Sequence, residues 1–289
     1  MQQAKVYLDY TQDELDKAYT QAAWAPNMKD VLARQSADSA KLRSVMAPRT
    51  FSYGPHPDET LDVFMSETAK GPIHVHIHGG GWRALTKDDV SFPAPVFTDA
   101  GATYIALNFS VIPTVRLPEM VAQAQRAICW LHSNARSFGG DPSRIHLSGH
   151  SAGAHMASVL LTTDWSARFG LPADILKSGL LMSGSYDLEP VMLSVRSSYV
   201  KISKDELLAL SAVRHVEQIR VPVTLVYGDK ETPEFQRQAV YFFEVLKKAS
   251  KTAEMICANG YNHFEIMDVF ADPRCRPESG WNSVRRDLR

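Results

Sequence analysis

The sequence predicts an α/β protein with a mostly parallel central sheet covered by helices on both faces. One observation predicts this class, and the composition agrees with it. From about residue 50 onward, short apolar runs alternate with segments of helical periodicity. Strands that alternate with helices pair in parallel and are buried on both faces. The 289 residues are 45% hydrophobic and 22% charged, which suits one domain with a large core over residues 1–289.

Six apolar segments have the length of buried strands. They are residues 73–77, 104–109, 145–148, 179–183, 223–227 and 253–258. A helix is expected at 118–136, where apolar side chains recur at helical spacing. The segment 186–220 holds a helix-capping signal at 203–206, and we expect a short lid insertion there.

The first 50 residues are predicted to be a helical extension. Thr11 and Glu14 have the spacing of a capping box, and Pro26 is expected to divide residues 9–35 into two short helices. Two roles remain open for this extension, a cap over a functional site or a contact in a homodimer.

Composition excludes several classes of function. A net charge of −1 argues against a nucleic-acid partner, and no apolar run reaches the ~18 residues of a membrane span. The start lacks the features of a secretory signal, and three scattered cysteines form no disulfide or zinc framework. No nucleotide or haem motif appears. We therefore expect a cytoplasmic protein that acts on a small molecule without a cofactor, and a solvated arginine-rich end at 274–289.

A candidate nucleophile is Ser151, in the pattern G-x-S-x-G at 149–153. The pattern lies between the predicted strand at 145–148 and a helical run at 154–160. A sharp turn between strand and helix exposes a serine hydroxyl at the positive end of the helix, where a developing anion is stabilised. This context favours catalysis over an incidental serine in a glycine-rich turn.

A glycine-rich loop, HGGGW at 78–82, follows the strand at 73–77. Glycines leave backbone N–H groups uncovered, so Gly80 and Gly81 are candidate donors to a substrate oxyanion, together with the amide of Ala152.

The alternating histidines His74, His76 and His78 offer a competing interpretation. They share one face of a strand, and such a pattern can bind zinc, which would indicate a metal-dependent hydrolase. No acidic or cysteine side chain follows closely except Asp88 and Asp89. We therefore expect no metal, and interpret His74 and His76 as hydrogen-bonded core residues.

A catalytic serine needs a base and an orienting carboxylate. Asp229 follows the strand at 223–227, and His263 lies in the loop after the last strand. We predict Asp229 as the acid and His263 as the base. Asp187 is a weaker candidate for the acid, and Glu231 is weaker again.

Together these motifs resemble α/β-hydrolases of the kynurenine formamidase (arylformamidase) and small carboxylesterase group. The resemblance covers residues 50–270 and rests on HGGGW, FGGDPSRIHLSGHSAGAH at 138–155, VYGDKE at 226–231 and NHF at 262–264. His155 after the turn is typical of formamidases, whereas Gly81 is closer to the esterase form of the loop. The resemblance implies the α/β-hydrolase fold and a triad of Ser151, Asp229 and His263.

The resemblance also implies metal-independent cleavage of a small carboxylic ester or aryl amide through an acyl-enzyme. A general carboxylesterase without formamidase activity is the alternative. A non-catalytic binding protein is a further one, although such proteins commonly lose a triad member. Four aromatic residues beside the predicted catalytic loops are candidates to line the substrate pocket. They are Trp82, Phe109, Tyr186 and Phe264.

Overall fold

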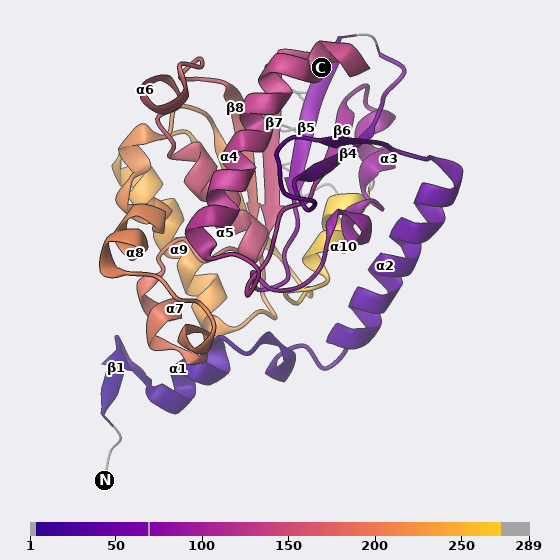
Figure 1. The fold of residues 1–289 in the computed structure, drawn as a ribbon. Helices are drawn as coiled ribbons and strands as arrows, with labels where there is room; N and C mark the ends of the chain where they lie inside the picture. The colour runs from indigo at the N-terminus through magenta and orange to yellow at the C-terminus, as the bar shows by residue number, and fades with distance from the viewer. Residues whose placement is uncertain (1–3, 69, 273–289) are drawn as a thin grey trace.

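The computed structural model describes residues 4–68 and 70–272. Its centre is an eight-stranded sheet with the strand order β10-β9-β8-β7-β5-β6-β4-β3 (Figure 1). Strand β4 is antiparallel to both of its neighbours, and the other neighbouring pairs are parallel. The strands are β3 (Arg49–Ser52), β4 (Thr60–Phe64), β5 (Gly71–Ile77), β6 (Thr103–Leu107), β7 (Gly140–His150), β8 (Leu176–Met182), β9 (Val223–Gly228) and β10 (Ala253–Ala258).

Helices cover both faces of this sheet. The larger apolar core lies under α4 (Leu117–Asn134), α5 (Ala152–Leu161) and α9 (Pro233–Lys248). A second core, on the opposite face, packs against α3 (Ala94–Thr98) and α10 (Ile266–Ala271). Neighbouring strand residues alternate between the two, as Val75 and Ile105 join the larger core while Tyr104 and Ala106 join the smaller one. The predicted sheet covered on both faces is therefore confirmed.

All six strands expected from apolar runs are present as parallel strands. The antiparallel edge formed by β3 and β4 was not predicted. Both strands are short, and β4 carries the buried carboxylate of Asp62 in the middle of its apolar run. That charge conceals the strand from a search for apolar segments.

The N-terminal extension passes the lower end of the sheet and then rises beside it as the long helix on the right of the view (Figure 1). A hairpin of β1 (Lys5–Tyr7) and β2 (Tyr10–Thr11) leads into α1 (Gln12–Ala18) and, after a short turn, α2 (Met28–Val45). The predicted capping box is present, since Thr11 N–H donates to Glu14 at 2.8 Å. Pro26 does separate two helices, but the second runs ten residues beyond the predicted end at 35.

The segment 186–220, predicted as a lid, is built of short helical pieces. These include α7 (Glu189–Leu193), the 3-10 turn η4 (Val195–Ser198) and α8 (Lys204–Leu210), which begins at the capping residue Ser203 as expected. The remaining short helix, α6 (Trp165–Phe169), follows α5. Within the described ranges, no helix has the length and apolar character needed to cross a membrane. Cys275 and the arginine-rich segment 274–289 lie outside the described residues.

Candidate active site

Ser151 occupies a strained turn between β7 and α5. Its backbone has φ +54° and ψ −118°, a region that side-chain-bearing residues rarely adopt. The turn forces close contacts, because a Cβ on Gly153 would lie 2.1 Å from the carbonyl oxygen of Ile77. Only glycine fits that position. The sharp turn places the Ser151 hydroxyl outside the sheet, at the N-terminus of α5.

His263 lies in the loop after β10 and contacts the serine. Its Nε2 is 2.9 Å from Ser151 Oγ, and the residue is only 4% exposed. The loop is fixed by His150, whose Nε2–H donates to the His263 carbonyl at 2.7 Å. Burial holds the pKa of His150 well below its usual value, so this ring stays neutral beside the base.

The carboxylate bonded to His263 belongs to Glu231, and the prediction that Asp229 takes this place is wrong. His263 Nδ1–H donates to Glu231 Oε2 at 2.7 Å. The other oxygen of Glu231 accepts from Gly228 N–H at 2.7 Å and from Ser183 Oγ at 2.5 Å. These three hydrogen bonds fix the orientation of the Glu231 side chain, which is 2% exposed.

Asp229 points away from this chain of hydrogen bonds. It is exposed, and its Oδ1 accepts from Gly260 N–H at 2.6 Å in the neighbouring loop. Glu231 N–H donates to the Gly228 carbonyl, which closes a turn after β9. This turn brings Glu231, and not Asp229, back over the end of the strand. Asp187 does not bond to His263 either; its Oδ1 accepts from Glu189 N–H at 3.1 Å.

The glycine loop faces the serine. Gly80 has φ +101°, and a Cβ there would lie 1.9 Å from the carbonyl oxygen of Ala84, so the turn requires glycine. The backbone amides of Gly80, Gly81 and Ala152 donate to no acceptor among the described residues. Gly80 and Gly81 line the same cavity as Ser151, and Ala152 directly follows the serine, so the three amides remain candidate donors to an oxyanion.

A cavity opens over Ser151 and His263, and much of its wall comes from the N-terminal extension. Its lining includes Tyr19 and Gln21 from the segment after α1, and Leu32 and Gln35 from α2. The extension therefore caps the site, which was one of its two predicted roles. The segment 186–220 adds Val195, Arg196 and Tyr199 to the same wall.

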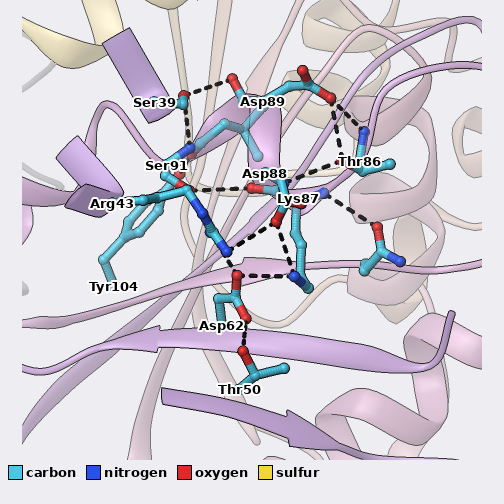
Figure 2. A network of polar contacts seen from close by, with 12 residues as sticks. Ser39, Arg43, Thr50, Asp62, Thr86, Lys87, Asp88, Asp89, Ser91 and Tyr104 are labelled. Carbon is cyan, nitrogen blue, oxygen red and sulfur yellow. Dashed lines mark hydrogen bonds and ion pairs between the residues drawn. The ribbon is translucent and has the colours of Figure 1, made fainter. Parts of the chain in front are cut away.

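A buried ionic network anchors α2 against the sheet (Figure 2). Asp62 of β4 is fully buried and accepts from Arg43 of α2 at 2.6 Å. It also accepts from Lys87 at 3.0 Å, in the 3-10 turn η2 (Lys87–Val90) that follows the glycine loop, and from Thr50 at 2.6 Å. One carboxylate therefore joins the helix that walls the cavity to the segment after the oxyanion loop.

Of the four aromatic residues predicted to line the pocket, one does so. Phe264 lines the cavity. The prediction is wrong for the other three, which pack in the larger core at 3% exposure or less. Trp82 donates from Nε1 to His155 at 3.3 Å, Phe109 stacks on His78 at 4.3 Å between centroids, and Tyr186 stacks on Phe242 at 4.6 Å. Aromatic side chains beside strand ends belong to the core here.

The alternating histidines His74 and His76 of β5, and His78 directly after that strand, are core residues. The Ser148 hydroxyl bridges His74 Nε2 at 2.7 Å and His76 Nδ1 at 2.8 Å, while His78 Nδ1–H donates to the Gly79 carbonyl. Burial lowers the pKa of His76 to about 3 and of His78 to about 4, so both rings are neutral. Within residues 4–68 and 70–272, no group of three His, Cys, Asp or Glu side chains is placed to hold a metal ion.

Comparisons with known proteins find hydrolase families and enzymes that this chain resembles. The family model BD-FAE matches residues 61–178, and the model of the carboxylesterase family matches residues 122–258. A kynurenine formamidase of Danio rerio is 29% identical over 91% of this chain and 92% of its own length. The esterase LipQ of Mycobacterium tuberculosis is 26% identical over 78% of this chain and 58% of its own.

Solved structures show the same fold. The crystal structure of a putative thioesterase from Silicibacter sp. superposes with a TM-score of 0.81 at 27% identity, over 94% of this chain and 99% of that one. Esterase B of Lactobacillus rhamnosis superposes with a TM-score of 0.73 at 19% identity, over 95% and 96% of the two chains.

Proposed function

Since the chain is an α/β-hydrolase of the carboxylesterase and arylformamidase type, we propose that it hydrolyses a small aryl formamide through a covalent acyl-enzyme, with small carboxylic esters as further substrates. The observation that carries this proposal is the hydrogen-bonded chain from Glu231 through His263 to Ser151. It ends at a cavity lined by Gly80 and Gly81, whose backbone amides donate to no acceptor among the described residues.

In the first half of the reaction, Ser151 Oγ attacks the acyl carbon and its proton passes to His263 Nε2. His263 then carries a positive charge, which Glu231 stabilises from the Nδ1 side without taking the proton. The amides of Gly80, Gly81 and Ala152 donate to the developing oxyanion. His263 next gives its Nε2 proton to the leaving arylamine or alcohol, which departs and leaves acylated Ser151.

In the second half, His263 accepts a proton from water as that water attacks the acyl carbon of the ester. Collapse of the tetrahedral intermediate breaks the bond to Ser151 Oγ, and the proton on His263 returns to the serine. The products are the free carboxylic acid, formic acid in the case of a formamide, and the amine or alcohol.

Full-length similarity supports the formamide as substrate. The kynurenine formamidases of Danio rerio and Salmo salar match 91% of this chain over more than nine-tenths of their own lengths. The plant isoprenylcysteine methylesterases match over less than three-fifths of theirs. A general carboxylesterase is the second candidate, and Gly81 favours it, because the third glycine brings the loop closer to the esterase form.

The test compares kcat/KM for N-formylkynurenine with the values for 4-nitrophenyl acetate and butyrate, in wild type and Ser151→Ala. We expect the formamide to exceed both esters by two decades or more, and the variant to hydrolyse none of the three. An inert formamide with active esters would assign the carboxylesterase. Turnover retained by Ser151→Ala would contradict both functions.

We also propose that the protein works in the cytoplasm on a small-molecule substrate. The described cysteines, Cys129 and Cys257, are unpaired, as is usual in a reducing compartment. Cell fractionation tests the location, and recovery of the protein from an exported fraction would contradict it.

A further inference from the structure

The wall of the active-site cavity contains a buried cation without a carboxylate partner. Arg196 of η4 is 7% exposed and lines the cavity that holds Ser151. Its Nε–H donates to the Tyr19 carbonyl at 3.2 Å and one Nη2–H donates to Gln21 Oε1 at 2.6 Å, so both partners are neutral. Among the described residues, Arg196 forms no ion pair, and its Nη1 donates no hydrogen bond.

Arg237, unlike Arg196, has a carboxylate partner. Arg237 holds Glu234 through two bonds of 2.7 Å, and the same carboxylate accepts from the hydroxyl of Tyr19 at 3.2 Å. Glu234 is thereby occupied and gives Arg196 no counter-ion. Arg196 instead lies between three aromatic rings, with its guanidinium carbon 5.4 Å from the centroid of Tyr19 and 5.6 Å from those of Trp82 and Phe235.

This arrangement is costly for the folded protein. Burial lowers the pKa of Arg196, although an arginine in this setting keeps its charge. Cation–π contacts offset part of the lost hydration, but a buried charge without a counter-ion destabilises the fold. Residues that carry such a cost at an active site commonly gain their partner from a ligand.

A second unpaired arginine lies on the same cavity wall. Arg83, directly after the glycine loop, forms no ion pair among the described residues and rests over the ring of Tyr199 at 4.5 Å. The hydroxyl of Tyr199 would lie 3.6 Å from a Cβ on Gly81, which places this pair beside the oxyanion loop. Asp89 is the acidic side chain of the lining, and it is already bonded to Ser36 and Thr86.

We propose that Arg196 is a specificity residue, which binds a carboxylate carried by the substrate close to the scissile acyl bond, and that Arg83 adds positive charge at the entrance. The preferred substrates are therefore anionic esters or amides. A guanidinium presents two parallel N–H donors to a carboxylate, and here Nη1 and the second Nη2 hydrogen remain to make them. The proposal rests on the proposed function, because it assigns the cavity to a substrate of Ser151.

The experiment uses matched pairs of esters that differ in one charge. On the leaving-group side these are 4-acetoxybenzoate and the neutral 4-acetoxybenzamide. On the acyl side they are mono(4-nitrophenyl) adipate and 4-nitrophenyl hexanoate. We expect wild type to prefer the anion in at least one pair by about tenfold or more in kcat/KM, chiefly through KM, as hydrogen bonds to charged groups contribute at about that level. Equal or poorer turnover of the anion in both pairs would overturn the proposal.

Two variants assign the preference to Arg196. Arg196→Gln should lower the anion-to-neutral ratio by about 10- to 100-fold, whereas Arg196→Lys should keep part of it. The matched control is Arg214→Gln, an arginine of the same segment 186–220 that pairs with Glu189 outside the cavity lining; its ratio should stay that of wild type. If Arg196 only ties η4 to the N-terminal segment, Arg196→Gln would lower the melting temperature and leave the ratio unchanged, which contradicts the proposal.

Binding to Ser151→Ala separates this proposal from the function on which it rests. Calorimetry with benzoate and benzamide reads anion recognition without turnover, and we expect benzoate to bind at least tenfold more tightly. Ser151-dependent turnover without any anion preference would overturn the carboxylate proposal alone. Absence of turnover, together with tight and Arg196-dependent benzoate binding, would overturn the serine-hydrolase function alone.

Discussion

Removing the negative charge of Glu231 tests the assignment of the catalytic acid. In Glu231→Gln, one end of the side chain must be an NH₂ group. If the amide oxygen keeps the bonds from Gly228 N–H and Ser183, the NH₂ faces His263 Nδ1. A donor in that position stabilises the tautomer with the proton on Nε2, which cannot accept the proton of Ser151.

The size of the effect follows from this tautomer. Replacing the acid of a serine triad by its amide lowers kcat by roughly 10⁴, which corresponds to about 5.5 kcal/mol of transition-state free energy. We expect a loss of 10³- to 10⁴-fold in Glu231→Gln. Asp229→Asn removes an equal charge two residues away but only weakens the bond from Gly260 N–H, so we expect less than a threefold change.

The assay is kcat and KM for 4-nitrophenyl acetate in both variants, with circular dichroism to show that each is folded. A large loss in Asp229→Asn with near-normal turnover in Glu231→Gln would refute the assignment and restore the acid expected from the sequence.

Three further predictions concern the support of the site. Asp62→Asn should lower the free energy of unfolding in urea by about 3 kcal/mol, because Arg43 and Lys87 lose their buried counter-ion and keep only the exposed carboxylate of Asp88. Asp174→Asn at an exposed pair should cost far less, and equal losses would contradict the network. Gly80→Ala should lower kcat by about 10²-fold or more, since the methyl group meets the Ala84 carbonyl and displaces the oxyanion amides. The control is Gly139→Ala: Gly139 also has a positive φ, but no atom lies near its Cβ position, so kcat should stay unchanged. The fold should lose stability as pH falls from about 6.5 toward 4, because the unfolded chain binds protons that the buried histidines cannot bind. Urea midpoints at pH 7.5, 6 and 5 measure that loss, and a flat profile would refute it.

The histidines behind the acid sensitivity share depressed pKa values, caused mainly by burial. Stability is therefore fully present above the ordinary histidine pKa and is lost as pH falls toward the folded values. The residues are His74, His76, His78, His146, His150 and His155.

The sheet and the serine turn could be predicted from the sequence because their signals are local. Apolar runs of strand length and the pattern G-x-S-x-G each lie within a few neighbouring residues. The turn after β9 is different. Asp229 stands at the strand end in sequence, yet the reverse turn from Gly228 brings Glu231 to His263, and only the three-residue spacing after Gly228 hinted at it.

Burial of the aromatic residues depends on tertiary packing, which sequence position alone does not determine. Trp82 follows the glycine loop, but its ring turns into the core toward His155. Arg196 was missed for a related reason, because an arginine in a segment of mixed composition looks solvated. What distinguishes it is the absence of a carboxylate partner, and that is visible only in three dimensions.

The central claim is that Ser151, activated by His263 and Glu231, is the nucleophile. Intact-protein mass spectrometry after treatment with a fluorophosphonate tests it most directly, because the reagent bonds only to an activated serine. The account predicts one adduct per wild-type chain, located on the peptide that contains Ser151, loss of hydrolysis in proportion to labelling, and no adduct in Ser151→Ala. An unlabelled but active wild type, or equal labelling of Ser151→Ala, would contradict it.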